Sequence, residues 1–318
     1  MIIFNSIEEI GNIEPVAVAL GNFDGIHRGH RELIETAVRE AGRRGIRSAV
    51  FTFSEHPRNV MAGKTVVRNI IYEDEKNELL ETAGVDYLFS LPFDEKMRTQ
   101  TPESFVRELL MDRFHVDTAI CGFNFTYGHK ASGTAETLQE AGRHYGFNVV
   151  VIPSVLVGGE VVSSTLIRQC IMEGDIHKAS ELLGRSYTLR GTVIHGEKMG
   201  RRIGFPTCNI TIDESMVTPA NGVYVTGCWV DGVRHCSITN VGNKPTVGQF
   251  EKNIETNILN FDEDVYGKTI CVEFMEQIRT EKKFSGLEEL KKQIREDVRT
   301  ASAFHRENNE NILRCEAT

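Results

Sequence analysis

Gly-Asn-Phe-Asp-Gly-Ile-His-Arg-Gly-His, at residues 21–30, is the most informative stretch of this 318-residue chain. It follows the short apolar run 16–20, which is typical of a strand buried on both faces. After it, apolar residues recur at helical spacing over 33–41, and Gly42 and Gly45 are expected to close that helix. A strand, a glycine-rich turn and a helix predict the first half of a Rossmann-like unit.

The two histidines of this stretch predict a site for a polyphosphate. His27 and His30 fall at positions i and i+3 of the first helical turn, where backbone N–H groups lack internal partners and the helix dipole is positive. The glycines let the backbone come close to the phosphates. The spacing fits neither G-x-G-x-x-G nor the P-loop. The alternatives are two solvated helix residues or a metal pair, although no further ligand stands at zinc-like spacing.

Composition limits the class of protein. The length allows two domains, and the net charge of −9 argues against a broad surface for nucleic acid. Seven cysteines, an odd number without a C-x-x-C pair, favour a reduced cytoplasmic chain. Residues 1–11 lack the basic region of a signal peptide. The longest apolar run, 149–157, contains Pro153 and is too short to span a membrane, so no membrane role is expected.

Residues 1–185 alternate between strand-like and helix-like segments, which predicts a parallel sheet covered by helices. The expected strands after the first are 48–53, 87–91, 118–121 and 148–152. The expected helices are 73–83, 102–114, capped by Thr101, and 135–145. A further helix opens at 163–168, and the one after it has Asp175 as its N-cap and Gly184 as its stop.

Residues 186–318 have a different character and are expected to form a second domain. Short strand-like segments separated by turns continue to about residue 278 and predict a small antiparallel barrel. Asp231-Gly232 is a strong signal for a hairpin turn. The segment 285–313 carries an apolar stripe at helical spacing and predicts a C-terminal helix.

Three more segments of the first domain are expected to join the histidines, because loops at the carboxyl ends of parallel strands converge. They are 52–57, 121–134 and 163–168. Ser164 and Thr165 offer donors to a phosphate, and Arg168 can pair with a triphosphate. The aromatic residues Phe123, Phe125 and Tyr127 offer faces for a planar ring. The plainer interpretations are a helix cap, a half-buried strand and a structural histidine at position 56.

The second domain carries its own cluster of glycine and polar residues. Thr207 and Asn209 are neutral oxygen ligands suited to Mg²⁺. Residues 240–246 are expected to form a flexible loop, and Glu255 beyond it could take a proton from an alcohol. Glycines and prolines also punctuate any small barrel, and a single glutamate in a strand is usually a surface residue.

Together these segments resemble known enzymes. Residues 21–30 are similar to the G-x-F-D-x-x-H-x-G-H signature of the nucleotidylyltransferase superfamily. Residues 163–168 match the S-S-T-x-I-R motif of the bifunctional riboflavin kinase/FAD synthetases. Residues 191–209 resemble that family's kinase motif G-x-V-x-x-G-x-x-x-G-R-x-x-G-F-P-T-A-N, with Cys208 for alanine, and 240–246 resemble N-I-G-x-x-P-T. The resemblance extends over residues 17–297.

Four positions depart from the family pattern. Asn124 stands where the family commonly has aspartate, and Glu55 stands where it has proline. Asn257 and Asn260 replace residues of the H-x-L-D-F-like stretch that follows the family's glutamate. The glutamate itself is kept as Glu255.

The resemblance implies a Rossmann-like α/β nucleotidylyltransferase domain, then a riboflavin kinase-like antiparallel barrel and a C-terminal helix. It implies two ATP- and Mg²⁺-dependent reactions, riboflavin to FMN and FMN to FAD. The implied catalytic residues are His27, His30, Arg168 and Glu255. The implied ATP-binding residues are Gly21, Phe23, Gly25, Gly29, Ser164, Thr165, Gly191, His195, Gly200 and Arg201. The implied flavin-binding residues are Asn124, Phe125, Tyr127, Phe205 and Arg279, and the implied metal ligands are Thr207 and Asn209.

Three alternatives stay open at this point. One is a paralogue with a single activity, in which the kinase half is the likelier loss. Another is a flavin-binding sensor that uses an inherited pocket. The intact His27 and Arg168 argue against a sensor, because a protein that only binds flavin needs no residues to hold a leaving group. An adenylyltransferase for nicotinamide or pantetheine phosphates explains the first half alone. We expect the bifunctional enzyme, acting on riboflavin, FMN and ATP as a monomer or weak homo-oligomer.

Overall fold

The structure is a computed structural model that describes residues 1–195, 200, 204–246 and 249–308. Its contacts divide the chain into two compact units, Met1–Ser164 and Thr165–Thr318. The helices α7 (Ser164–Glu173) and α8 (Ile176–Leu183) fall almost wholly in the second unit, where α8 packs on the barrel strands. The change in composition after residue 185 stays our prediction for the boundary between the two catalytic domains.

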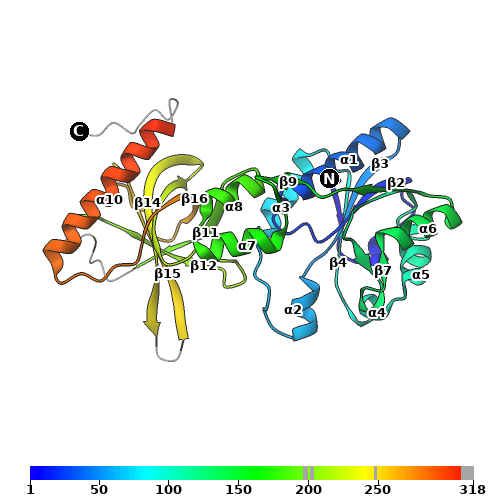
Figure 1. Cartoon of the computed structure of the whole chain (residues 1–318), viewed down its shortest axis with the longest axis horizontal. Coiled ribbons are helices and arrows are strands. Elements are labelled where there is room, and N and C mark those ends of the chain that lie inside the picture. The colour runs from blue at the N-terminus through cyan, green and yellow to red at the C-terminus, as the bar shows by residue number, and fades with distance from the viewer. Residues whose placement is uncertain (196–199, 201–203, 247–248, 309–318) are drawn as a thin grey trace. The chain divides into compact units, whose positions relative to one another are not determined.

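The first unit is built on a six-stranded parallel sheet (Figure 1). The strands, in spatial order, are β1 (Ile2–Phe4), β4 (Tyr87–Leu91), β3 (Arg47–Phe53), β2 (Val16–Leu20), β5 (Val116–Gly122) and β8 (Asn148–Ile152). The chain moves outward from β2 through β3 to β4, then returns to β5 on the other side of β2. The loops after β2 and β5 therefore diverge at the topological switch point, where open α/β sheets bind ligands.

The side chains of β2 point alternately to the two faces of the sheet, and each face packs on its own hydrophobic core. Ala17 and Ala19 pack with Leu33 and other residues of α1 (Arg28–Arg44) on one face. Val16, Val18 and Leu20 pack on the other face with buried residues of a π-helical segment, η2 (Phe105–Met111). Successive side chains of a strand point to opposite faces, so an apolar run without polar interruptions indicates a central strand of a covered sheet.

The remaining elements of the first unit are helices, short hairpins and turns that connect the strands of the sheet. The helices are α2 (Pro57–Ala62), α3 (Glu73–Thr82), α4 (Glu95–Thr99), α5 (Pro102–Ser104) and α6 (Ala135–Tyr145). Two short hairpins are β6 (Thr126–Tyr127) with β7 (Gly133–Thr134), and β9 (Leu156–Val157) with β10 (Glu160–Val161). Single 3₁₀ turns are η1 (Ile7–Glu9) and η3 (His129–Ala131).

Most expected elements of this unit are confirmed, with local differences. The helix 102–114 begins at the Thr101 cap but becomes π-helical from Phe105 and ends at Met111. Helix α1 runs through Gly42 and ends at Gly45, whose φ of 68° is left-handed. Glycine adopts such a φ without strain, so Gly45 and not Gly42 is the stop. Helix α2 was not expected; His56 caps it and Pro57 opens it.

The second unit is a closed barrel of six antiparallel strands, as expected. In spatial order they are β11 (Tyr187–Ile194), β12 (Cys208–Ile212), β15 (Gln249–Ile258), β14 (Val233–Thr246), β13 (Gly222–Val230) and β16 (Thr269–Thr280). Asp231 and Gly232 both have positive φ, 48° and 80°, and turn β13 into β14. That conformation is the type I′ turn that Asp-Gly favours.

One expectation for the barrel unit needs correction. Residues 240–246 form the end of strand β14, paired with β15, and are not a loop. Gly242 and Pro245 within this segment suggested a loop, but the continuous pairing with β15 satisfies the backbone there. The C-terminal helix α10 runs over Leu287–Asn308; its expected extension to residue 313 lies outside the described residues.

Helix α10 covers one side of the barrel (Figure 1). Its Ala301 packs on Val223, Val225 and Ile238, which point outward from β13 and β14. The neighbouring residues Thr226, Ser237, Thr239 and Thr256 are also buried, and their hydroxyls form a chain with O–O distances of 2.7–2.9 Å. Each buried hydroxyl thus finds a partner.

The cysteines differ from the expectation of a fully reduced chain. Among the described residues, Cys236 is disulfide-bonded. The free thiols in the same part of the chain are Cys121, Cys170, Cys208, Cys228 and Cys271. None of the described helices combines the length and apolarity needed to cross a bilayer.

Candidate active sites

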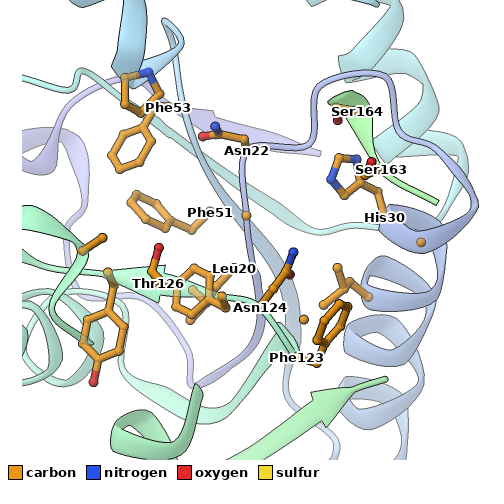
Figure 2. A pocket seen from close by; sticks show the side chains of 18 of the residues that line it. Leu20, Asn22, His30, Phe51, Phe53, Phe123, Asn124, Thr126, Ser163 and Ser164 are labelled. Atoms are coloured by element: carbon orange, nitrogen blue, oxygen red, sulfur yellow. The ribbon is translucent and has the colours of Figure 1, made fainter. Parts of the chain in front are cut away.

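A pocket of about 680 Å³ opens at the switch point of the first unit. Leu20, Gly21 and Asn22 line it from the end of β2, and the loop that follows Gly122 lines it from the end of β5. Figure 2 shows its two ends: His30 with Ser163 and Ser164 on one side, and the rings of Phe51 and Phe53 on the other. The convergence of loops from separate strands, expected from the sequence, is thus found for these segments.

The histidine end is organised by the start of α1. His27 is the N-cap, and its Nδ1 accepts a hydrogen bond from the backbone N–H of His30 over 3.1 Å. This bond requires Nδ1 without a proton, so in the neutral ring the proton sits on Nε2. The two imidazoles lie nearly parallel, with ring centres 3.6 Å apart, and both line the pocket. His27 is 5% exposed, and Gly29 lies between the two histidines, at the pocket wall.

The turn before α1 holds a tight backbone conformation. Phe23, Gly25 and Ile26 have φ values of 46°, 90° and 37°. A Cβ on Gly25 would lie 3.2 Å from the Ile70 side chain, so conformation and space both favour glycine there. Phe23 is fully buried, and its ring centre lies 5.1 Å from that of His30. Phe23 and Gly25 therefore shape the turn, whereas Gly21 lines the pocket.

Side chains from distant segments fix this turn in place. The Thr52 hydroxyl donates to the Asn22 carbonyl over 2.9 Å, and the Ser164 hydroxyl donates to the Asp24 carbonyl over 2.9 Å. The Asp24 carboxylate accepts from the Ile70 N–H over 2.9 Å. Thr165 and Arg168 belong to the second unit, and their expected contacts with a triphosphate stay predictions.

The other end of the pocket is aromatic. Phe125 and Tyr127 are stacked, with ring centres 5.8 Å apart and an interplanar angle of 16°, and Tyr127 lies 5.0 Å from the ring of Phe105. Asn124 is exposed at the pocket and lies beside Gly122. Burial raises the pKa of Tyr127, whose hydroxyl lies 3.2 Å from that of Thr137. This end offers flat apolar faces on which a planar ring system can stack.

In the barrel, two of the expected residues lie side by side. Asn209 of β12 is directly paired with Glu255 of β15, and Glu255 is paired on its other side with Asn240 of β14. Directly opposed residues in antiparallel strands point to the same face, so the three side chains form a polar row across three strands. The Asn253 amide donates to the Glu255 carboxylate over 2.7 Å.

Thr207 and Asn209 also line a small cavity of about 80 Å³. Cys208, between them, has its thiol pKa raised to about 11 by burial. A thiol is a soft donor, whereas the Thr207 hydroxyl and the Asn209 amide offer hard oxygen atoms. No three His, Cys, Asp or Glu side chains within the described ranges form a metal cluster. A site with neutral oxygen donors and substrate phosphates fits Mg²⁺ better than zinc.

The other expected residues of the barrel lie in separate segments and are described one by one. The His195 ring lies 4.0 Å from that of Tyr266, which lines the same cavity. A Cβ on Gly191 would lie 2.2 Å from the Thr211 carbonyl oxygen, and one on Gly200 would lie 2.3 Å from the Phe205 carbonyl oxygen. Both positions therefore admit only glycine without a backbone shift. Arg201 lies outside the described residues.

Arg279 is held by the C-terminal helix. Its guanidinium donates to both carboxylate oxygens of the buried Asp297 in α10, over 2.8–3.1 Å. It also lies 5.7 Å from the centre of the Phe284 ring. A bidentate pair of this kind fixes the direction of the arginine, and its expected contact with flavin stays a prediction.

Comparison with known proteins agrees with the two halves. The FAD synthetase family model matches residues 10–166, and the riboflavin kinase family model matches residues 183–305. The chain is 36% identical over 299 residues to the bifunctional riboflavin kinase/FMN adenylyltransferase of Bacillus subtilis, covering 90% of this chain and 92% of that protein.

The chain belongs to the bifunctional riboflavin kinase/FMN adenylyltransferase family.

The Escherichia coli K12 member of this family is 34% identical over 292 residues, covering 92% of this chain and 93% of that protein. A crystal structure described as a macrolide-efflux protein from Streptococcus pneumoniae has a TM-score of 0.87 and 31% identity, covering 94% of this chain and 98% of that one. The fold expected from the family resemblance, a parallel α/β sheet followed by a closed barrel and a helix, is confirmed.

Sequence reasoning missed much of the aromatic pocket in this family member. Apolar lining residues outside the expected segments include Phe51, Met61, Phe93, Met97 and Phe105, whereas Phe53 belongs to the expected segment 52–57. Phe51 and Phe53 alternate along β3 and so belong to one face, which a period of two in the sequence could have indicated. Phe93 and Phe105 belong to separate segments, and only the tertiary structure brings them to the pocket.

Proposed function

We propose that the first unit transfers the adenylyl group of ATP to FMN, and that the barrel unit phosphorylates riboflavin to FMN. The observation that carries the first assignment is a single pocket with a histidine-lined helix N-terminus at one end and stacked aromatic rings at the other. Such a pocket suits an acceptor that joins a flat ring system to a phosphate.

In the adenylyl transfer, an oxygen of the FMN phosphate attacks the α-phosphorus of ATP. The bond from that phosphorus to the bridging oxygen breaks, and pyrophosphate leaves with the electron pair. We assign His27 and His30 to the charge that develops on the leaving group, aided by the N–H groups and dipole of α1. Nδ1 of His27 accepts from the His30 N–H, so we assign the Nε2–H of the neutral ring as the donor to a phosphate oxygen.

In the phosphorylation, the riboflavin 5′-hydroxyl attacks the γ-phosphorus of ATP, and ADP leaves. We assign Glu255 as the base that takes the hydroxyl proton, because its carboxylate lies on the polar row with Asn209. Thr207 and Asn209 would hold Mg²⁺ with ATP, and a bound metal would neutralise charge on the transferred phosphoryl group. The product of the barrel is then the acceptor of the first unit.

One incubation tests the proposal directly. The purified chain is mixed with riboflavin, ATP and Mg²⁺, and the flavins are separated over time. The proposal expects FMN to appear first and FAD to follow. FMN alone, or FAD only from added FMN, would reduce the proposal to one activity, and no turnover would leave a flavin-binding protein. Omission of Mg²⁺ with a chelator is expected to stop both reactions.

Two variants assign the activities to their units. His30→Ala is expected to abolish FAD formation, with a fall in its rate of about a hundredfold or more. FMN formation is expected to stay intact. Glu255→Gln is expected to lower FMN formation by about a hundredfold or more and to leave FAD formation from added FMN intact. Glu276→Gln, at an exposed position on β16, is the matched control. Unchanged FMN formation in Glu255→Gln would mean that the base is elsewhere.

We further propose that the partners of the chain are these small molecules and that it works in the cytoplasm. The net charge of −9 supports a chain that binds anions through local geometry and not through a general attraction for nucleic acid. An electrophoretic shift experiment with nucleic acid at low salt is expected to show no complex.

A further inference from the structure

A buried lysine lies behind the phosphate turn of the first unit. Lys76 of α3 is 8% exposed and lines a cavity of about 100 Å³. Asn22 and Asp24 of the turn line the same cavity. The family resemblance and the proposed chemistry assign no role to Lys76. A lysine is rarely buried to this degree unless an opposite charge lies near its ammonium group.

The charges around this cavity indicate which groups attract the Lys76 ammonium. Burial lowers the pKa of Lys76, and attraction from Glu73 and Asp24 partly offsets that effect. Glu73 attracts the Lys76 ammonium more strongly than Asp24 does, and all three residues line the cavity. Its polar lining is completed by neutral groups from Asn22, Ser54, Asn69 and by the His56 ring. An extra anion would meet a net negative surface, so this cavity is poorly suited to bind a phosphate itself.

Asp24 is the carboxylate whose charge matters for the substrate. Its side chain is 9% exposed and is fixed by the Ile70 N–H, and its carbonyl is fixed by Ser164. It is the fourth residue of the stretch that leads into the N-terminus of α1, three residues before the His27 cap. A rigid negative charge at this place repels a triphosphate, and weak screening inside the protein makes the repulsion act over a long distance.

We infer that Lys76 is a positioning residue for adenylyl transfer, which acts by neutralising the Asp24 carboxylate behind the turn that receives the triphosphate. This inference rests on the proposed function of the first unit. Lys76 does not touch the substrate in this role. It weakens the field of the Asp24 carboxylate, which opposes the binding of ATP, while Asp24 keeps its structural bond to Ile70.

A double-mutant cycle on the full chain tests the inference. The variants are Lys76→Met, Asp24→Asn and the two combined, and Lys76→Arg keeps the charge. Asn at position 24 still offers an oxygen to the Ile70 N–H. The KM for ATP, the KM for FMN and kcat are measured for FAD formation from added FMN. Circular dichroism and thermal unfolding show whether the first unit is folded in each variant, and FMN formation from riboflavin reports the barrel unit alone.

Lys76→Met is expected to raise the KM for ATP about tenfold, the effect of one unit charge at roughly 10 Å with an effective dielectric constant of about 20. The KM for FMN is expected to stay unchanged. In the Asp24→Asn background the same substitution is expected to change the KM for ATP by less than about twofold, because the charge that Lys76 neutralises is gone. Lys76→Arg is expected to stay within about threefold of the unchanged chain.

Three results would overturn the inference. Equal losses from Lys76→Met in both backgrounds would indicate a structural role alone, and thermal unfolding would then show the same destabilisation in both. A rise in the KM for FMN alone would indicate that Lys76 binds the phosphate of the acceptor. If Lys76→Met does not fold, Lys76→Gln replaces it in both backgrounds of the cycle. Absence of FAD formation by the unchanged chain would overturn the proposed function instead, and ATP titration of the same variants would still test the charge effect.

Discussion

The Ser164 hydroxyl donates a hydrogen bond of 2.9 Å to the carbonyl oxygen of Asp24, across 140 residues of sequence. This bond joins the two motifs that suggested a nucleotide site, the glycine-rich turn and the hydroxyl triplet. It also shows that Ser164 has a structural partner, so its hydroxyl helps to hold the turn in addition to any contact with phosphate. Ser164 and the turn residues Gly21 and Asn22 all line the pocket.

Ser164→Ala is expected to loosen the turn and lower kcat/KM for FAD formation by about fivefold to tenfold, since one hydrogen bond is worth about 1 kcal/mol. Ser163→Ala is the matched control, because Ser163 lines the same pocket. FMN formation from riboflavin is expected to be unchanged in both. Equal effects of the two substitutions on FAD formation would contradict a special role for the bond to Asp24.

His27 has two separable roles, as cap of α1 and as a candidate donor to phosphate. His27→Asn removes the imidazole and keeps an oxygen that can accept from the His30 N–H, because asparagine is among the best N-caps. We expect FAD formation to fall by about a hundredfold or more while thermal stability of the first unit changes by less than about 1 kcal/mol. His27→Ala is expected to lose both. Retention of activity in His27→Asn would reduce His27 to a cap.

The aromatic end of the pocket can be disturbed without touching the histidines. A Cβ on Gly133 would lie 2.6 Å from the ring of Tyr127, its partner across the β6–β7 hairpin. Gly133→Ala is therefore expected to push the ring from its place and raise the KM for FMN by about tenfold, with a smaller effect on the KM for ATP. Gly42→Ala, in a helix with no atom near the added Cβ, is the control and should be neutral or stabilising. A change in the KM for ATP alone would contradict the placement of the flavin.

Acid is expected to destabilise the barrel unit through His305. This residue of α10 is fully buried, and its Nε2 lies 3.1 Å from the Thr226 carbonyl oxygen. Burial lowers its pKa, with a further contribution from the charge of Arg234. Between that lowered pKa and the ordinary value of about 6.5, the unfolded chain binds more protons, so the free energy of unfolding falls as pH falls.

His305→Gln keeps an N–H donor and removes the titration. We expect the melting temperature of the barrel to fall less between pH 7 and pH 5 in this variant than in the unchanged chain, as followed by calorimetry. His177→Gln, at an exposed position on α8, serves as the control. The same pH slope in His305→Gln and the unchanged chain would show that another group carries the effect.

Some elements could be read from local sequence because their signals are local. The Asp231-Gly232 turn, the Asp175 cap and the Gly184 stop all depend on the conformations of one to four residues. Helix α6 was expected over its observed range, 135–145, and the structure adds a capping box at Thr134. The same local rules misled at residues 240–246, where pairing with a neighbouring strand outweighs the tendency of glycine and proline to form loops.

The residues of the sites also divide into those that local motifs indicated and those that only the tertiary structure revealed. The sequence indicated the histidine pair and the polar residues of the barrel, because each lies in a compact motif. It did not indicate Lys76, which lies in a helix with a weak pattern and acquires its environment from the turn packed against it. Nor did it indicate Phe93 or Phe105, which reach the pocket from separate segments.

The sequence by itself determined the kinds of element, their order and the two families of motif, because backbone conformation and helix or strand periodicity are short-range properties. The tertiary structure decided which distant groups meet: Ser164 with Asp24, Asn209 with Glu255, and the aromatic rings around one cavity. Those meetings depend on the order of strands in the sheet and on barrel closure, and both are set by burial of apolar surface over the whole unit.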